Sequence, residues 1–195
     1  MFQRHPRVLH TEGRGLSMCL PQSRPEGQYP CTMPAIVGLI SDSHSRWERT
    51  KRAIEALQAK GATTFIHCGD VEDDLVLDQL AGLDSHLVWG NCDWNRDSLA
   101  RYAANIGITA HGDSGEITVD GKRIAFTHGH ELPALRAAVT TGADYLIHGH
   151  THELRDERTA GTRIINPGAL HRAARYTVAT LEPATDQLTI IEVPA

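Results

Sequence analysis

Histidine and aspartate residues follow several apolar runs of this sequence, in positions where they could bind metal ions. The apolar run at residues 36–40 is followed by Asp42 and His44. Such a run is typical of a buried strand in a parallel sheet, and open α/β sheets bind ligands at the carboxyl ends of their strands. Later runs end in the same way, so the candidate ligands are Asp42, His44, Asp70, Asn91, His128, His150 and His152.

These seven side chains follow five expected strands, whose neighbouring ends can bring them into one small volume. Carboxylate, amide and imidazole ligands without a thiolate suit borderline ions such as Mn²⁺, Fe²⁺, Ni²⁺ or Zn²⁺. Seven ligands are too many for one tetrahedral ion, whereas two ions that share one carboxylate can account for all seven. Paired ions about 3.5–4 Å apart can hold the attacking and leaving oxygens of a phosphoryl displacement. The residues therefore predict a two-metal site for phosphoryl chemistry.

The elements that must position these residues can be predicted from residue 34 onward. Strands are expected at 36–40, 63–67 and 86–89, and helices at 46–60, around 75–80 and at 96–105. Gly61 should end the first helix, and Trp47 should lie on its buried face. Asp120 and Gly121 predict a hairpin turn. Further on we expect a short helix from residue 133 and strands at 144–147, 153–157, 162–165, 176–181 and 187–193. Two sheets packed face to face with helices outside are expected.

The composition is that of a globular domain. Hydrophobic residues make up 41% and charged residues 22% of the 195 residues, and no stretch approaches the roughly 20 apolar residues that a spanning helix needs. We therefore expect no membrane association. A net charge of −5 argues against general nucleic-acid binding. The four cysteines form no C-x-x-C pair, which suits a reducing compartment and predicts a cytoplasmic protein. The sequence leaves open whether the chain forms a homo-oligomer.

The N-terminal stretch differs from the rest of the chain. Residues 1–33 contain four prolines and no periodic apolar pattern, which predicts a disordered extension. An upstream start codon, with Met33 as the true start, is the alternative. Residues 34–195 are then the folded domain.

Five short blocks, taken in order, carry a resemblance to a known family. They are Asp42-x-His44, Gly69-Asp70, Gly90-Asn91-x-Asp93, His128-Gly129 and Gly149-His150-x-His152. This set resembles the calcineurin-like metallophosphoesterases, and Asn166-Pro167-Gly168 is similar to their small prokaryotic phosphodiesterase branch. The resemblance implies a four-layer α/β/β/α sandwich of two mixed sheets flanked by helices. It also implies a binuclear site in which Asp42, His44 and His152 hold one ion, Asn91, His128 and His150 hold the other, and Asp70 bridges them.

The resemblance also implies an activity. We expect a metal-dependent phosphodiesterase in which a hydroxide bridging two divalent ions attacks phosphorus. Mn²⁺ is the favoured ion, with Ni²⁺, Fe²⁺ or Zn²⁺ as alternatives, and the substrate is expected to be a small phosphodiester or a nucleotide. Asp93 is expected to orient a ligand or a neighbouring imidazole, as carboxylates commonly do at metal sites.

The sequence departs from the family pattern at Cys92. Many family members have a histidine at this position, where an imidazole can act as general acid for the departing alkoxide. A neutral thiol is a poorer hydrogen-bond donor, so strong phosphomonoesterase activity is in doubt, and the small phosphodiesterase branch commonly has cysteine here. Cys92 and Asp93 are therefore the candidates that act beside the metal ligands, either by contacting a ligand or by facing the substrate. A nucleophilic Cys92 would need a base partner, and the sequence identifies none.

Two alternative functions stay open. One is a phosphomonoesterase. The other is a non-catalytic metal-binding scaffold, because a eukaryotic trafficking-coat subunit resembles the same branch and serves as a binding platform. A scaffold is free to lose ligands, whereas all seven positions here hold competent side chains, which favours the enzyme. His67 is interpreted as packed core.

Overall fold

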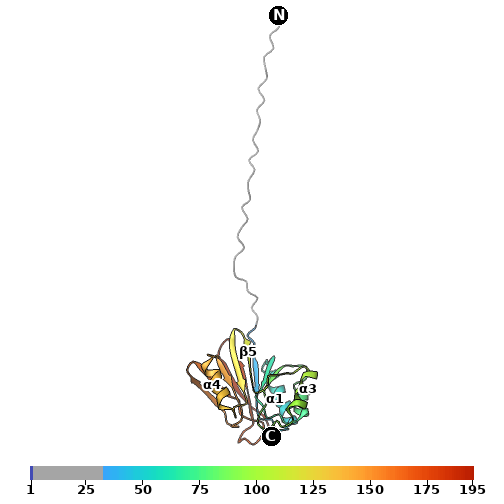
Figure 1. Cartoon of the computed structure of the whole chain (residues 1–195). Helices are drawn as coiled ribbons and strands as arrows, with labels where there is room; N and C mark the ends of the chain where they lie inside the picture. The colour runs from blue at the N-terminus through green and yellow to red at the C-terminus, as the bar shows by residue number, and fades with distance from the viewer. Residues whose placement is uncertain (2–32) are drawn as a thin grey trace. The chain divides into compact units, whose positions relative to one another are not determined.

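The structure is a computed structural model that describes Met1 and residues 33–195 (Figure 1). Residues 33–195 form one compact unit. Apart from Met1 and Met33, the residues for which we predicted a disordered extension lie outside the described part, so that expectation and the alternative start stay predictions. Among the described residues, no helix is both long enough and apolar enough to cross a membrane.

Two mixed sheets form the centre of the domain. The first has the strand order β11-β10-β1-β2-β3-β4, in which β1 to β4 run parallel and β10 and β11 are antiparallel additions. Its strands are β1 (Val37–Ile40), β2 (Thr64–His67), β3 (Asp84–Leu87), β4 (Thr109–Ala110), β10 (Thr177–Glu182) and β11 (Gln187–Glu192). The second has the order β5-β6-β7-β9-β8. Its strands are β5 (Ser114–Val119), β6 (Lys122–Thr127), β7 (Tyr145–Ile147), β8 (Arg155–Thr159) and β9 (Thr162–Asn166).

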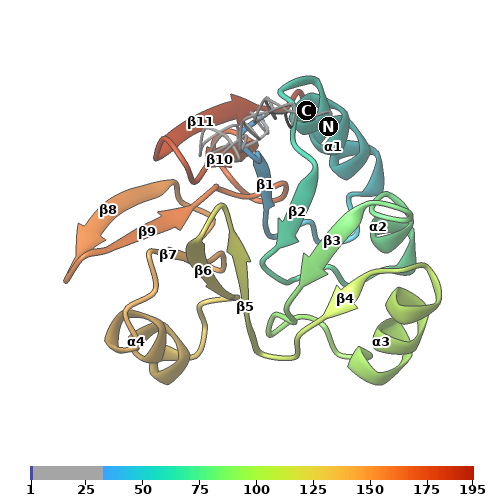
Figure 2. The same ribbon diagram turned by 90° about the horizontal axis from the view of Figure 1, so that it is seen from above.

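The helices cover the outer faces of the two sheets. They are α1 (Trp47–Ala59), α2 (Asp74–Asp78), α3 (Arg96–Asn105) and α4 (Leu132–Thr140). Helices α1, α2 and α3 lie beside the first sheet, and α4 lies on the opposite side of the molecule, against β6 and β7 (Figure 2). Successive side chains of β1 point to opposite faces of the first sheet. Leu39 packs between the two sheets, while Ile40 packs on the outer face toward α1. This arrangement confirms the predicted four-layer α/β/β/α sandwich.

Local sequence signals act as expected at two turns. Gly61 follows α1 with a φ of +87°, the left-handed conformation that ends many helices. Asp120 and Gly121 join β5 to β6 with φ angles of +49° and +75°, which matches the positive φ values of a type I′ hairpin turn.

Several expected boundaries were wrong. Strand β3 spans Asp84–Leu87 rather than 86–89, because Val88 and Trp89 lie beyond its ladder, where they donate to the carbonyls of His67 and Gly112. Strand β8 begins at Arg155 rather than at residue 153, and the two-residue strand β4 was not predicted. Trp47 was expected to be buried but is 37% exposed, because it is the first residue of α1.

Candidate metal centre

The loops that leave five strands meet at one end of the two sheets. Strands β1, β2 and β3 of the first sheet are followed by loops that carry Asp42 and His44, Asp70 and Asn91, and strands β6 and β7 of the second by loops that carry His128, His150 and His152. Hydrogen bonds tie these loops together. Within each sheet, the amide of Gly149 donates to the carbonyl of His128, and the amide of Asp42 to that of Gly69. Between the sheets, the amide of His150 donates to the Asp42 carboxylate. The two sheets thus present the candidate ligands to each other.

Asp42, His44 and His152 form one group of possible ligands. One atom from each lies within 4.8 Å of the others. The Nε2 atom of His152 is 3.3 Å from Oδ1 of Asp42 and 3.3 Å from Nε2 of His44. The Asp42 carboxylate is fully buried and accepts hydrogen bonds from the Ser41 hydroxyl and the His150 amide. This group could hold one divalent ion.

His128 is the centre of a second group. Its Nε2 atom is 3.0 Å from Oδ1 of Asn91 and 3.4 Å from Oδ2 of Asp70. The ring of His150 lies beside it, with 5.1 Å between the ring centroids, and burial lowers the pKa of His150. Imidazole and amide groups gathered at a carboxylate are a suitable donor set for a second divalent ion.

Asp70 lies between the two groups. Its Oδ2 atom is 3.4 Å from Nε2 of His44 and 3.4 Å from Nε2 of His128, while its Oδ1 atom accepts a hydrogen bond of 2.8 Å from the Cys92 amide. Burial would raise the pKa of this carboxyl, but the hydrogen bonds and charge of His128 outweigh burial and hold that pKa well below its usual range. The geometry is that of a carboxylate that can contact ions on both sides.

The hydrogen bonds of the two central histidines show that this cluster fits a cation. Nδ1 of His128 lies 2.7 Å from the carbonyl oxygen of Cys68, and because a carbonyl can only accept, this nitrogen carries the hydrogen. Nδ1 of His44 lies 2.7 Å from Oε1 of Glu72, which has the same consequence. In the neutral rings both Nε2 atoms therefore present lone pairs toward the Asp70 carboxylate. While these rings are neutral, acceptor atoms that converge at 3.0–3.4 Å repel each other unless a cation lies between them, either a proton on Nε2 or a metal ion.

The backbone at these loop positions is strained. The left-handed region, which residues other than glycine rarely adopt, is occupied by five candidate ligands, namely Asp42, His44, Asp70, His150 and His152. Gly90 allows the loops to approach each other, because a Cβ atom there would lie 2.0 Å from Oδ1 of Asp70. At Gly149 the corresponding distance to Oγ of Ser41 is 1.7 Å. The loops are held in a tight arrangement that other residues would disrupt.

Asp93 holds the loop backbone. Its buried carboxylate accepts four backbone hydrogen bonds of 2.7–3.0 Å, from the amides of Asp70, Val71, Glu72 and Gly90. These amides belong to the loops that carry Asp70 and Asn91. Asp93 therefore contacts the backbone of the loops that carry two candidate ligands, and the expectation that it orients a ligand or a neighbouring imidazole stays a prediction.

Two further contacts support the loop that carries Asp42 and His44, and the sequence did not reveal either. Glu72 fixes the ring of His44, as described above. His67 is fully buried, and its Nε2 atom lies 2.7 Å from Oγ of Ser43, between the two ligands. Nδ1 of His67 accepts from the Gly69 amide, so Nε2 carries the hydrogen and donates to Ser43. Burial lowers the pKa of His67 to about 4, which keeps the ring neutral. His67 is core, as expected, but it also supports the site.

Cys92 lies among the candidate ligands. One atom each from Cys92, His44 and Asp70 lie within 4.8 Å of one another. Burial and the negative charge of Asp70 raise the pKa of the Cys92 thiol to about 11. In this environment the side chain is a neutral thiol at pH 7, which is a weak proton donor and a poor nucleophile.

Replacing Glu72 should weaken metal binding. We expect Glu72→Gln to reduce the affinity of the protein for divalent ions by about 10- to 100-fold, because the His44 ring loses the acceptor that fixes its tautomer. Calorimetric titration with Zn²⁺ measures the effect. Glu55→Gln, at an exposed carboxylate of α1, is the matched control and should bind normally. Equal affinities of the two variants would show that Glu72 does not orient the ligand.

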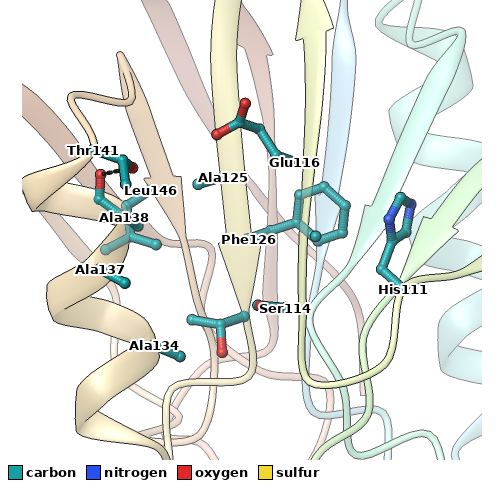
Figure 3. A pocket seen from close by; sticks show the side chains of 12 residues that line it. His111, Ser114, Glu116, Ala125, Phe126, Ala134, Ala137, Ala138, Thr141 and Leu146 are labelled. Carbon is teal, nitrogen blue, oxygen red and sulfur yellow. Dashed lines mark hydrogen bonds between the residues drawn. The ribbon is translucent and has the colours of Figure 1, made fainter.

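The structure also has a cavity of about 380 Å³ that contains none of the seven candidate ligands. It lies between α4 and strands β5 and β6, with His111 on the far side (Figure 3). Its walls are mostly small and apolar, including Ala125, Ala134 and Ala137. This cavity includes no residue of the candidate metal-ligand groups.

Comparison with known proteins agrees with the fold. Residues 36–186 match the family model described as the calcineurin-like phosphoesterase superfamily domain, and the chain belongs to this superfamily. A curated relative named as a phosphodiesterase from Methanocaldococcus jannaschii is 31% identical over 136 residues, which cover 68% of this chain and 82% of the relative. The resemblance inferred from the five blocks is confirmed, and the protein is a hydrolase that acts on ester bonds.

Solved structures give the same fold. A structure described as a novel archaeal phosphodiesterase superposes with a TM-score of 0.74 and 27% sequence identity, covering 80% of this chain and 99% of that one. The vacuolar protein sorting 29 protein of Cryptosporidium parvum has a TM-score of 0.58 and 18% identity, covering 82% and 96% of the two chains. The second likeness shows the shared fold alone.

Proposed function

We propose that this protein is a phosphodiesterase that uses two divalent metal ions. Asp42, His44 and His152 would hold one ion, Asn91, His128 and His150 the other, and Asp70 would contact both. The observation that carries the proposal is the position of Asp70 Oδ2, 3.4 Å from both His44 Nε2 and His128 Nε2. The phosphodiesterase relative and the archaeal phosphodiesterase structure support the reaction class. Mn²⁺ is our preferred ion, with Ni²⁺, Fe²⁺ or Zn²⁺ as alternatives, because carboxylate, amide and imidazole ligands without a thiolate suit these ions.

The ions would supply Lewis acidity and a water of lowered pKa, the two properties that phosphate-ester cleavage requires at neutral pH. The chain's own residues have separate tasks. Glu72 and the Cys68 carbonyl hold His44 and His128 with their Nε2 lone pairs turned inward. Asp93 keeps the ligand-bearing loops at a fixed separation through its backbone hydrogen bonds. This prior arrangement removes the need to reorganise the site during the reaction.

A diester is favoured over a monoester because the site lacks an obvious strong proton donor at the position of Cys92. A small phosphodiester or a nucleotide is the proposed substrate. An aryl ester tests the reaction class, since its leaving group departs without a proton. The metal-stripped protein should hydrolyse bis-p-nitrophenyl phosphate when Mn²⁺ is restored. If no divalent ion restores diester hydrolysis, the proposal is refuted and the non-catalytic scaffold is favoured.

Replacement of the thiol tests the role assigned to position 92. We expect Cys92→His to increase the hydrolysis of phosphomonoesters with poor leaving groups, such as glycerol 2-phosphate, by on the order of 10²-fold, because an imidazole can protonate the departing alkoxide. Phosphate release measures the gain, and Cys92→Ser is the control that adds no titratable imidazole. Unchanged monoester turnover in the histidine variant would contradict the general-acid argument.

A further inference from the structure

Trp94 is the most exposed of the three tryptophans. Its side chain is 89% exposed, compared with 37% for Trp47 and 4% for Trp89. Its backbone is nevertheless held in a turn, since the Trp94 amide donates to the carbonyl of Cys92 at 3.0 Å. Burial of the large apolar surface of an indole ring is favourable in free energy. A tryptophan that is exposed at the edge of a site therefore has a surface available for a ligand.

The indole borders a cavity that reaches the candidate metal centre. This cavity has a volume of about 390 Å³ and is lined by Asn91, Asp93, Trp94, Asn95, Arg96 and Asp97. Asn91 is a proposed ligand of the second ion, so a group in this cavity would be continuous with a phosphate held at the metal centre. The volume lies within the range of ordinary small-molecule sites.

The charges in this cavity disfavour a second phosphate. Its one basic side chain, Arg96, is already engaged: the guanidinium pairs with Asp113 at 2.7 Å and donates to the carbonyls of Gly90 and Asp93. The other charged groups in its walls are the carboxylates of Asp93 and Asp97. A different cavity, on the His152 side of the centre, carries Arg172 and Arg175. An anionic group would favour that side, and an uncharged planar group the side of Trp94.

From these observations we propose that the cavity beside Trp94 binds the nucleobase of a nucleotide substrate by stacking on the indole. The inference rests on the proposed function, because it places the phosphate of the same substrate at the metal centre. Aromatic side chains stack on any base. Amide and carboxylate groups at Asn95 and Asp97 can accept hydrogen bonds from the edge of a base. Trp94 is then a specificity-determining residue that selects nucleoside esters over alkyl esters.

The test compares two ligands that differ by the base alone. Thymidine 5′-monophosphate and 2-deoxyribose 5-phosphate are titrated calorimetrically into the Zn²⁺-loaded full chain. We expect the nucleotide to bind about tenfold or more tightly than the sugar phosphate, within the range that base stacking provides. Trp94→Ala should bind the two equally, and Trp94→Phe should keep part of the preference. Trp47→Phe is the control and should resemble the wild type. Equal binding of the two ligands by the wild type, or an undiminished preference in Trp94→Ala, would overturn the inference.

Fluorescence gives a second readout that needs no turnover. Thymidine 5′-monophosphate should quench the emission of the wild type and of Trp47→Phe, but not that of Trp94→Phe. If quenching is lost in Trp47→Phe and kept in Trp94→Phe, the inference is overturned. The outcomes separate the two proposals. Diester hydrolysis without a preference for the base would leave the phosphodiesterase and remove the base site. Base-dependent binding without diester hydrolysis would support the base-binding cavity and refute the phosphodiesterase proposal.

Discussion

Asp70→Asn should abolish the hydrolysis of bis-p-nitrophenyl phosphate. The substitution keeps the size of the side chain but removes the negative charge from the one group that lies 3.4 Å from both His44 and His128. Charge stabilisation by bound metal is worth several kcal/mol in the transition state, so we expect kcat/KM to fall by on the order of 10³-fold or more. Steady-state kinetics at saturating Mn²⁺ measure the loss.

Two controls make the Asp70 result specific. Glu55→Gln, at an exposed carboxylate on α1, should hydrolyse the same aryl diester at the wild-type rate, since neither candidate metal group nor the cavity beside Trp94 includes it. Thermal unfolding should show that Asp70→Asn is folded. A folded Asp70→Asn protein with near-normal kcat/KM would exclude Asp70 as a shared ligand.

Of the proposed substitutions, Asp93→Ala should cause the largest decrease in the free energy of unfolding. The substitution leaves four backbone amides without the carboxylate that accepts their hydrogen bonds, and each unsatisfied buried donor costs about 1–3 kcal/mol. Partial access of water reduces the sum, so we expect the free energy of unfolding to fall by about 3 kcal/mol or more. Urea denaturation of the metal-free protein measures the loss without any contribution from bound ions.

Asp93→Asn provides the graded comparison for that experiment. An asparagine keeps one acceptor oxygen but turns an NH₂ group toward the same amides, so its stability should lie between those of the wild type and Asp93→Ala. Asp97→Ala should change the free energy of unfolding by less than about 0.5 kcal/mol, as is usual for an exposed position. An Asp93→Ala protein as stable as Asp97→Ala would show that these hydrogen bonds contribute little.

The candidate ligands could be predicted because their signal is local. Each lies within a few residues after an apolar run, and a parallel sheet necessarily collects the carboxyl ends of its strands at one end of the sheet. Asp42 after β1 and Asp70 after β2 are examples, since the pairing of Ile40 with His67 places the two loops side by side. The turn at Asp120-Gly121 is predictable for a similar reason, because two adjacent residues determine its conformation.

The groups that support the ligands could not be predicted in the same way. Glu72 is 28 residues from His44, and His67 is 24 residues from Ser43. Their pairing depends on how the loops cross once the sheet has formed. The partners of Asp93 could not be predicted because they are backbone amides, which every residue except proline carries and no sequence pattern marks. Strand β8 was misplaced because all five of its residues are exposed, so it lacks the alternation of apolar and polar residues that marks a half-buried strand.

Anomalous diffraction from crystals grown with Mn²⁺ tests the central claim most directly, because it locates each ion and counts ions per chain. We predict two peaks on opposite sides of the Asp70 carboxylate. One should be in contact with Asp42, His44 and His152, and the other with Asn91, His128 and His150. A single peak, or two peaks that do not share Asp70, at full Mn²⁺ occupancy would contradict the two-metal account.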